Sequence, residues 1–188
     1  MKILLLNAGA KDYGATQEIL LTIQNEIPTS ESVSLICLGG KDLRFCAGCK
    51  TCYDTCKCFQ DDDVAAILDA MDDSDIVVIA APSYWADIPG QFKVFIDRCT
   101  PYSNTNPNPN RRMLKVGKKC YGIALRTGFR PFECEHIIDT IKHWCGHMGI
   151  EMAGSMFFCG INDREDIQQY KDLIREKTVE WISKSPAI

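Results

Sequence analysis

The sequence predicts an α/β fold, a three-layer α/β/α arrangement in which helices cover both faces of a five-stranded parallel sheet. Short apolar runs recur along the 188 residues, and helical patterns alternate with them. Strands that are apolar throughout are typical of parallel sheets buried between two helical layers. The length suits one domain, and no boundary or internal repeat divides residues 1–188.

The first part of the chain predicts two strands and one helix. Residues 2–7, "KILLLN", form a fully apolar strand. In residues 15–27, Ile19 and Ile23 recur at helical spacing, so we expect an amphipathic helix there. Residues 32–38 alternate and then become apolar, as a second strand does.

A helix, a strand and another helix follow a cysteine-rich loop at 39–60. The helix at 61–75 has acidic residues in its first turn, where the helix dipole favours them. The strand at 75–82 is apolar and ends at a proline. The next helix, 89–99, is amphipathic and has a proline near its first turn.

The last third predicts the remaining two strands and two helices. An Asn/Pro-rich loop spans 100–117, and its residues 100–112 are expected to be a lid or a subunit contact, with simple disorder as the alternative. The expected order after it is a strand at 118–127, a helix at 132–149, a strand at 150–158 and a helix at 163–184.

Composition excludes several classes of function. Net charge is −4, and no Lys/Arg cluster indicates nucleic-acid binding. No apolar run approaches the roughly 18 residues of a membrane span, and the apolar N-terminal run is too short for a signal peptide. We therefore expect a cytoplasmic protein, where thiols stay reduced, and the odd count of 11 cysteines argues against a disulfide framework.

Ligands of such sheets bind beyond the carboxyl ends of the strands. The loop after the first strand, "NAGAKDYGAT", precedes a helix whose amides can bind an anion. Gly9 and Gly14 allow tight turns, and Thr16 can cap the helix. The loop matches neither the Walker A nor the G-x-G-x-x-G pattern, and a plain capping turn is the alternative.

The loops after the third and fourth strands complete this edge. In "APSYWADIPGQFKVFIDR", Tyr84 and Trp85 follow a strand end, where they can cover a flat apolar ligand or pack on the neighbouring helix. In "LRTGFRP", Thr127 and Gly128 can approach a ring with backbone groups.

With these motifs, nearly the whole chain resembles the flavodoxin-like NADPH-dependent FMN reductases and the related iron–sulfur flavoproteins. The string at 81–98 carries most of the likeness. The first loop departs from the family pattern, since Ala8-Gly9, Lys11 and Ala15 replace the usual Gly-Ser, Arg and Asn. FMN is still expected to bind.

The resemblance implies a doubly wound sheet with strand order 2-1-3-4-5 and an FMN site at its edge. Residues 9–16 would hold the phosphate, residues 82–86 would follow the isoalloxazine ring, and Thr127 and Gly128 would close the pocket. Hydride transfer to FMN requires no acid–base residue, so none is named. The implied cofactor-binding residues are Gly9, Lys11, Gly14, Ala15, Thr16, Pro82, Ser83, Tyr84, Trp85, Ala86, Thr127 and Gly128.

Five cysteines crowd the loop "RFCAGCKTCYDTCKC". Cys46, Cys49, Cys52 and Cys58 match the cluster motif of iron–sulfur flavoproteins, while Cys56 as the fourth ligand gives a ferredoxin-like spacing. Three interpretations stay open: a four-iron four-sulfur cluster, a structural zinc site, or thiols without metal.

The predicted function is reduction of a flavin, a quinone or another small acceptor by NADH or NADPH through FMN. One alternative is an electron carrier with a cluster on the cysteine loop and a ferredoxin-like donor. Another is a non-enzymatic domain with a zinc-stapled loop. The resemblance also implies a homodimer.

Overall fold

The computed structural model describes residues 1–184, and at its centre five parallel strands follow the order β2-β1-β3-β4-β5. Within the sheet, Leu5 lies in register with Leu35 on one side and Val78 on the other. The predicted order 2-1-3-4-5 is confirmed. The strands are β1 (Lys2–Asn7), β2 (Ser32–Cys37), β3 (Ile76–Pro82), β4 (Lys119–Leu125) and β5 (Glu151–Phe158).

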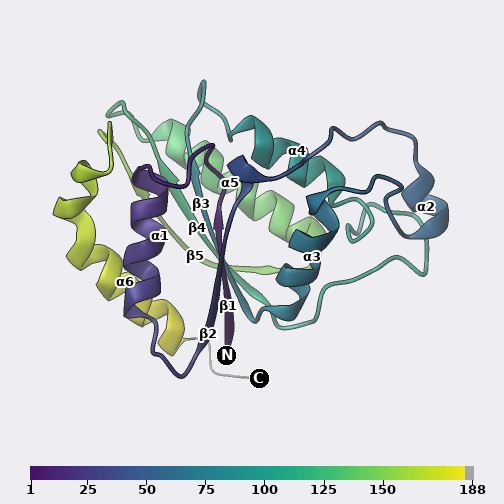
Figure 1. The fold of residues 1–188 in the computed structure, drawn as a ribbon, viewed down its shortest axis with the longest axis horizontal. Helices are drawn as coiled ribbons and strands as arrows, with labels where there is room; N and C mark the ends of the chain where they lie inside the picture. Colours follow the sequence, from purple (N-terminus) through teal and green to yellow (C-terminus); the bar gives the residue numbers. More distant parts are fainter. Residues whose placement is uncertain (185–188) are drawn as a thin grey trace.

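Helices cover both faces of this sheet (Figure 1). One layer holds α1 (Ala15–Glu26) and α6 (Lys171–Ser183). The opposite layer holds α3 (Asp63–Asp73), α4 (Gly90–Arg98) and α5 (Phe132–Met148). The predicted three-layer arrangement is confirmed.

Strand β1 shows why its sequence is apolar throughout. Leu4 and Leu6 pack in the core under α3, α4 and α5, whereas Ile3 and Leu5 pack in the core under α1 and α6. All four side chains are buried. Each contributes about 1.5–3 kcal/mol by leaving water, so a polar residue on either face would be costly.

The structure differs from the sequence-based prediction at two places. The cysteine-rich loop contains a short helix, α2 (Thr51–Thr55), after the 3₁₀ turn η1 (Leu38–Gly40). The predicted helix at 163–184 begins as a 3₁₀ segment, η2 (Glu165–Tyr170), and becomes α-helical only at Lys171. Neither short segment shows enough turns to reveal a period.

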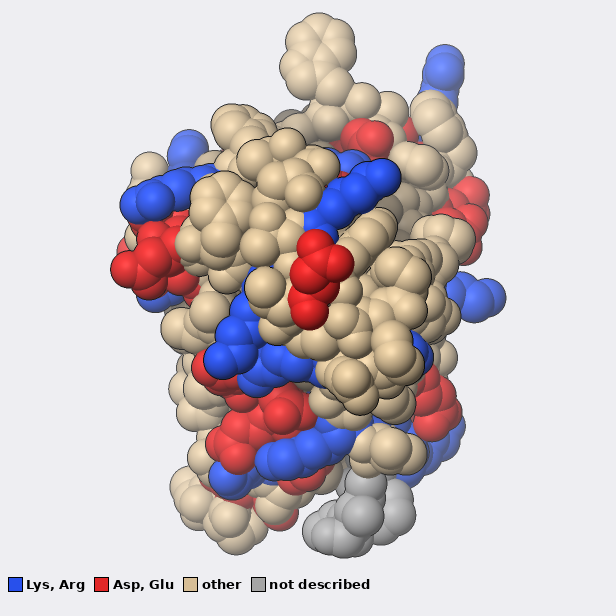
Figure 2. Space-filling model, turned by 90° about the vertical axis from the view of Figure 1, so that its right-hand side faces the viewer, with Lys and Arg blue, Asp and Glu red and all other residues tan. Residues whose placement is uncertain are grey.

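None of the helices within residues 1–184 has the length and apolarity needed to cross a membrane. On the face that carries α2, acidic and basic side chains lie side by side (Figure 2). Arg112 and Asp69 form one such pair. This face therefore presents no extended field of one sign.

Candidate functional site

The loops that follow β1, β3 and β4 meet at the carboxyl edge of the sheet. They surround a cavity of about 180 Å³. Trp85, Ala86 and Gly128 do not line it. Nine of the twelve residues predicted to bind the cofactor do: Gly9, Lys11, Gly14, Ala15, Thr16, Pro82, Ser83, Tyr84 and Thr127.

Five residues that line the cavity were not named as cofactor-binding from the sequence, although the first lies within the predicted phosphate range 9–16: Ala10, Leu125, Arg126, Ile161 and Asn162. Ala10 and Arg126 lie between or beside predicted residues, so a stricter reading of the same loops would have found them. Ile161 and Asn162 follow the edge strand β5. The rule that places ligands where the winding reverses gives no expectation for that loop.

Asn7 organises the first loop from inside. Its buried side chain accepts a hydrogen bond from the Gly9 amide (2.8 Å) and donates to the Lys11 carbonyl (3.0 Å) and to Gln17 Oε1 (2.8 Å). A Cβ on Gly9 would lie 3.0 Å from Asn7 Oδ1. Gly9 is therefore needed for close packing against the asparagine that shapes the loop.

The N-terminus of α1 is open toward this cavity. The prediction that Thr16 caps the helix is wrong, because Gly14 is the N-cap residue and no side chain hydrogen-bonds the first-turn amides. Thr16 lies inside the first turn and is buried. Free amides at a helix N-terminus, together with the helix dipole, favour an anion.

A strained turn follows β3. Tyr84 and Asp87 exchange backbone hydrogen bonds of 2.9 and 3.2 Å. Trp85 and Ala86 between them both have positive φ, 54° and 65°, a conformation that favours glycine or asparagine. Tyr84 lines the cavity, while Trp85 is fully exposed at the tip of the turn.

A polar network closes the other side of the cavity. Glu133, in the first turn of α5, accepts a hydrogen bond from Ser83 Oγ (2.8 Å) and pairs with Arg126 Nη1 (2.8 Å). Among the described residues, the buried Arg126 Nε has no hydrogen-bond partner. A Cβ on Gly128 would lie 2.3 Å from Arg126 Nη2, so Gly128 leaves space for the guanidinium.

The cysteine loop surrounds α2 and lies against α3 and α4. Cys46 and Cys49 are exposed, and Cys52 and Cys58 are half-buried. Burial raises the pKa of the Cys52 thiol, and the nearby thiols of Cys58, Cys46 and Cys49 raise it further.

These thiols do not converge on one point. Within residues 1–184, no three His, Cys, Asp or Glu side chains are arranged to hold a metal ion. Thr51 Oγ1 lies instead 3.2 Å from Cys49 Sγ, and its hydrogen bond lowers the pKa of that thiol. The residue types suit a cluster or zinc, but this arrangement does not fit either one.

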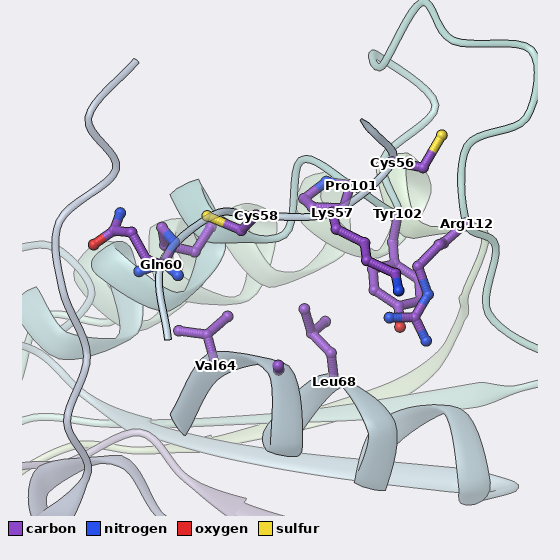
Figure 3. Close-up of a pocket in the computed structure, with 11 residues that line it drawn as sticks. Cys56, Lys57, Cys58, Gln60, Val64, Leu68, Pro101, Tyr102 and Arg112 are labelled. Carbon is purple, nitrogen blue, oxygen red and sulfur yellow. The ribbon is translucent and has the colours of Figure 1, made fainter. Parts of the chain in front are cut away.

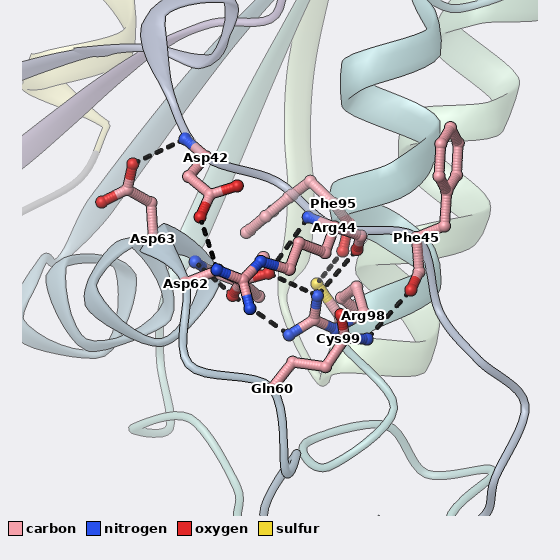
Figure 4. Close-up of polar contacts among 10 residues, drawn as sticks. Asp42, Arg44, Phe45, Gln60, Asp62, Asp63, Phe95, Arg98 and Cys99 are labelled. Atoms are coloured by element: carbon pink, nitrogen blue, oxygen red, sulfur yellow. Dashed lines mark hydrogen bonds and ion pairs between the residues drawn. The ribbon is translucent and has the colours of Figure 1, made fainter.

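Both ends of the cysteine loop are fastened to α4 (Figure 4). Arg98 donates to Asp62 Oδ2 (2.6 Å) and Oδ1 (3.1 Å) and to the Arg44 carbonyl (2.7 Å). The two paired side chains are almost completely buried. Gln60 Nε2 adds a hydrogen bond to the Phe45 carbonyl (2.9 Å), so residues 44–45 and 60–62 are held together.

The Asn/Pro-rich segment 100–117 holds the middle of the cysteine loop. Asn106 Nδ2 donates to the Cys52 carbonyl (3.1 Å) and Asn108 Nδ2 to the Tyr53 carbonyl (2.6 Å). Asn106 is buried. The alternative of simple disorder is therefore wrong for this segment, which is an ordered clasp on α2.

Comparison with known proteins places this geometry in context. A sequence model described as NADPH-dependent FMN reductase matches residues 1–151. An iron-sulfur flavoprotein of Archaeoglobus fulgidus is 30% identical over 105 residues, which cover 55% of this chain and 48% of that protein. An iron-sulfur flavoprotein of Clostridioides difficile is 27% identical over 155 residues, 69% of each chain.

A solved structure shares the fold over nearly the full length. An FMN-dependent NADH-azoreductase of Bacillus anthracis, determined in complex with FMN, has a TM-score of 0.67 and 15% identity. The match covers 96% of this chain and 99% of that one. The chain spans about half the length of the first curated relative that it matches.

Proposed function

The chain belongs to the NADPH-dependent FMN reductase family, and we propose that it binds FMN in the edge cavity and passes electrons from NADH or NADPH to a small acceptor. The observation that carries this proposal is the cavity itself. It joins an uncapped helix N-terminus to the loops after β3 and β4.

The residues present fit this cofactor. The first-turn amides of α1 and the Lys11 side chain would hold the phosphate. Pro82 and Tyr84 would lie along the ring, and Arg126 offers a buried Nε without a partner in the described chain. When bound, FMN would supply the redox chemistry, by which two electrons pass from the nicotinamide to the acceptor. The chain's own residues would bind the cofactor, orient it and exclude water from it.

Flavin reduction tests this proposal directly. Purified protein saturated with FMN should lose its oxidised-flavin absorption under anaerobic conditions when NADH or NADPH is added, and regain it with a quinone. Tyr84→Ala should weaken FMN binding roughly tenfold, because stacking contacts contribute about 0.5–1.5 kcal/mol beyond area burial. Bound flavin that neither nicotinamide reduces would overturn the assignment as a reductase.

We also propose that a second copy of the chain covers this edge. Three large aromatic side chains near the cavity are exposed, those of Trp85, Phe129 and Phe132. Trp85→Ala should therefore reduce dimer formation in analytical ultracentrifugation while leaving monomer folding intact. A wild-type protein that stays monomeric at high concentration contradicts this proposal.

A second candidate function is electron transfer through a cluster on the cysteine loop, with a ferredoxin-like donor. One observation favours it: the curated relatives are named iron-sulfur flavoproteins. The loop would have to rearrange to bring the four thiols together.

Iron, sulfide and zinc assays on anaerobically purified protein separate these possibilities. Cys52→Ser and Cys58→Ser should each remove iron if a cluster is present, whereas Cys56→Ser should retain it. Zinc in place of iron indicates a structural site. A protein that contains flavin and no metal leaves the reductase as the function.

A further inference from the structure

A second cavity lies on the other side of α3, away from the FMN site. It has a volume of about 250 Å³ and is enclosed by the cysteine loop, α3 and the start of the 100–117 segment (Figure 3). Val64, Ala65, Leu68 and Pro101 form its apolar wall. Drug-sized ligands occupy about 300–1,000 Å³, so this cavity suits a smaller molecule of one or two rings.

Two buried polar groups that line this cavity have no partner. Tyr102 is 4% exposed and Arg98 is 2% exposed. By bond geometry, neither the Tyr102 hydroxyl nor the Nε of Arg98 has a hydrogen-bond partner within the described part of the chain, although the Asp69 carboxylate lies beside the hydroxyl. Burial raises the pKa of Tyr102 to about 12, so the hydroxyl remains a hydrogen-bond donor. Unpaired buried donors cost free energy, which a ligand acceptor would recover.

The charges around the cavity leave one cation without a counter-ion. Arg98 is paired with Asp62, and Arg112 with Asp69 at 3.3 Å. The Lys57 ammonium has no carboxylate partner among residues 1–184, and its side chain runs toward Tyr102 and Arg112 (Figure 3). The Arg112 guanidinium also lies 4.5 Å from the centre of the Tyr102 ring.

From these observations we propose that the cavity binds a small aromatic monoanion, a one- or two-ring carboxylate or sulfonate. The apolar wall would take the ring, and the single negative charge would face Lys57 and Arg112. The Tyr102 hydroxyl would donate a hydrogen bond to the anion. This site is independent of the FMN cavity and of the reaction proposed there.

Calorimetric titration with 2-naphthoate tests the site, using protein saturated with FMN so that the edge cavity is occupied. The neutral analogue 2-naphthalenemethanol should bind at least roughly tenfold more weakly, because it lacks the charge-assisted contact. Lys57→Met should weaken the binding of 2-naphthoate by a similar factor. Lys41→Met, at an exposed lysine outside the cavity, should have no effect.

A steric pair provides the control that does not depend on charge. Ala65 and Ala66 are both exposed on α3, but only Ala65 lines the cavity. Ala65→Phe should abolish 2-naphthoate binding and keep FMN, whereas Ala66→Phe should keep both. The proposal is overturned if wild-type protein does not bind 2-naphthoate, if both alanine variants behave alike, or if the alcohol binds as tightly as the carboxylate.

Discussion

At the scale of single residues, the buried pair of Asp62 and Arg98 is expected to contribute strongly to stability. Burial by itself would raise the pKa of Asp62, but hydrogen bonds from Arg98 and the amides of Arg44 and Val64 outweigh it and lower the pKa. Asp62→Asn should lower the free energy of unfolding by about 3–5 kcal/mol, because it leaves a buried cation uncompensated. Urea denaturation at neutral pH measures this loss.

The pH dependence of that loss follows from the lowered pKa. A carboxyl whose pKa is depressed by folding stabilises the protein fully above its unfolded value, about 3.9, and loses this contribution as pH falls through the folded value. The gap between wild type and Asp62→Asn should therefore narrow below about pH 4. Asp61→Asn, at an exposed neighbour, is the control. A gap that stays constant to pH 3 would contradict the ionic origin.

Two glycines of the first loop should differ in FMN binding. Gly9→Ala places a Cβ 3.0 Å from Asn7 Oδ1 and should disturb the asparagine that shapes the loop. We therefore expect FMN to bind roughly tenfold more weakly. Gly14→Ala has φ of −92° and its Cβ meets no protein atom within 4 Å, so it should leave the shape of the loop intact and weaken FMN binding less than Gly9→Ala does. Fluorescence quenching of added FMN gives both values, and equal losses would show that Asn7 does not set the loop geometry.

The same two glycines show the limit of sequence reasoning at this scale. Both stand in a loop directly before a helix, and the pattern gave them equal weight. Only the position of the buried Asn7 side chain separates them. Arg126 illustrates the same limit, since its place in the cavity depends on Glu133 and on the space above Gly128.

At the scale of elements, the clasp on α2 is predicted to restrain the cysteine loop. The double variant Asn106→Ala/Asn108→Ala removes two hydrogen bonds to the carbonyls of Cys52 and Tyr53. Five-residue helices do not persist alone in water, so α2 should open more often. Alkylation of Cys52, followed by mass spectrometry, should become several-fold faster.

Asn110→Ala is the matched control for this clasp. Within residues 1–184 the Asn110 side chain makes no hydrogen bond to α2, and its backbone amide donates to Asn108 Oδ1. Cys52 alkylation in this variant should match the wild type. Unchanged alkylation in the double variant would mean that the Arg98 anchor alone restrains the loop.

This element also marks what sequence could not predict. The long strands and helices were found because their periods repeat several times, and the strand order was expected from the family resemblance. Helix α2 has five residues, too few to show a period. Segment 100–117 is ordered because it contacts residues more than 50 positions away, and local sequence patterns do not reveal such contacts.

At the scale of the whole molecule, FMN binding should stabilise the fold in a way that depends on the phosphate. A ligand that binds only the native state at 100 times its Kd adds about 2.7 kcal/mol, which corresponds to a rise of roughly 5–11 °C in Tm for a chain of this size. Riboflavin has the same ring and no phosphate. It should give a clearly smaller rise at the same concentration.

The difference between the two flavins isolates the anion site at the start of α1. In that proposed site the backbone amides have no side-chain cap and act beside Lys11, so deletion of the Lys11 side chain alone would not remove it. Thermal unfolding with FMN, riboflavin and inorganic phosphate therefore tests the site better than mutation does. Equal rises in Tm with FMN and riboflavin would show that residues 9–16 do not bind the phosphate. A shift with FMN alone would assign those residues to it and support the edge cavity as the flavin site.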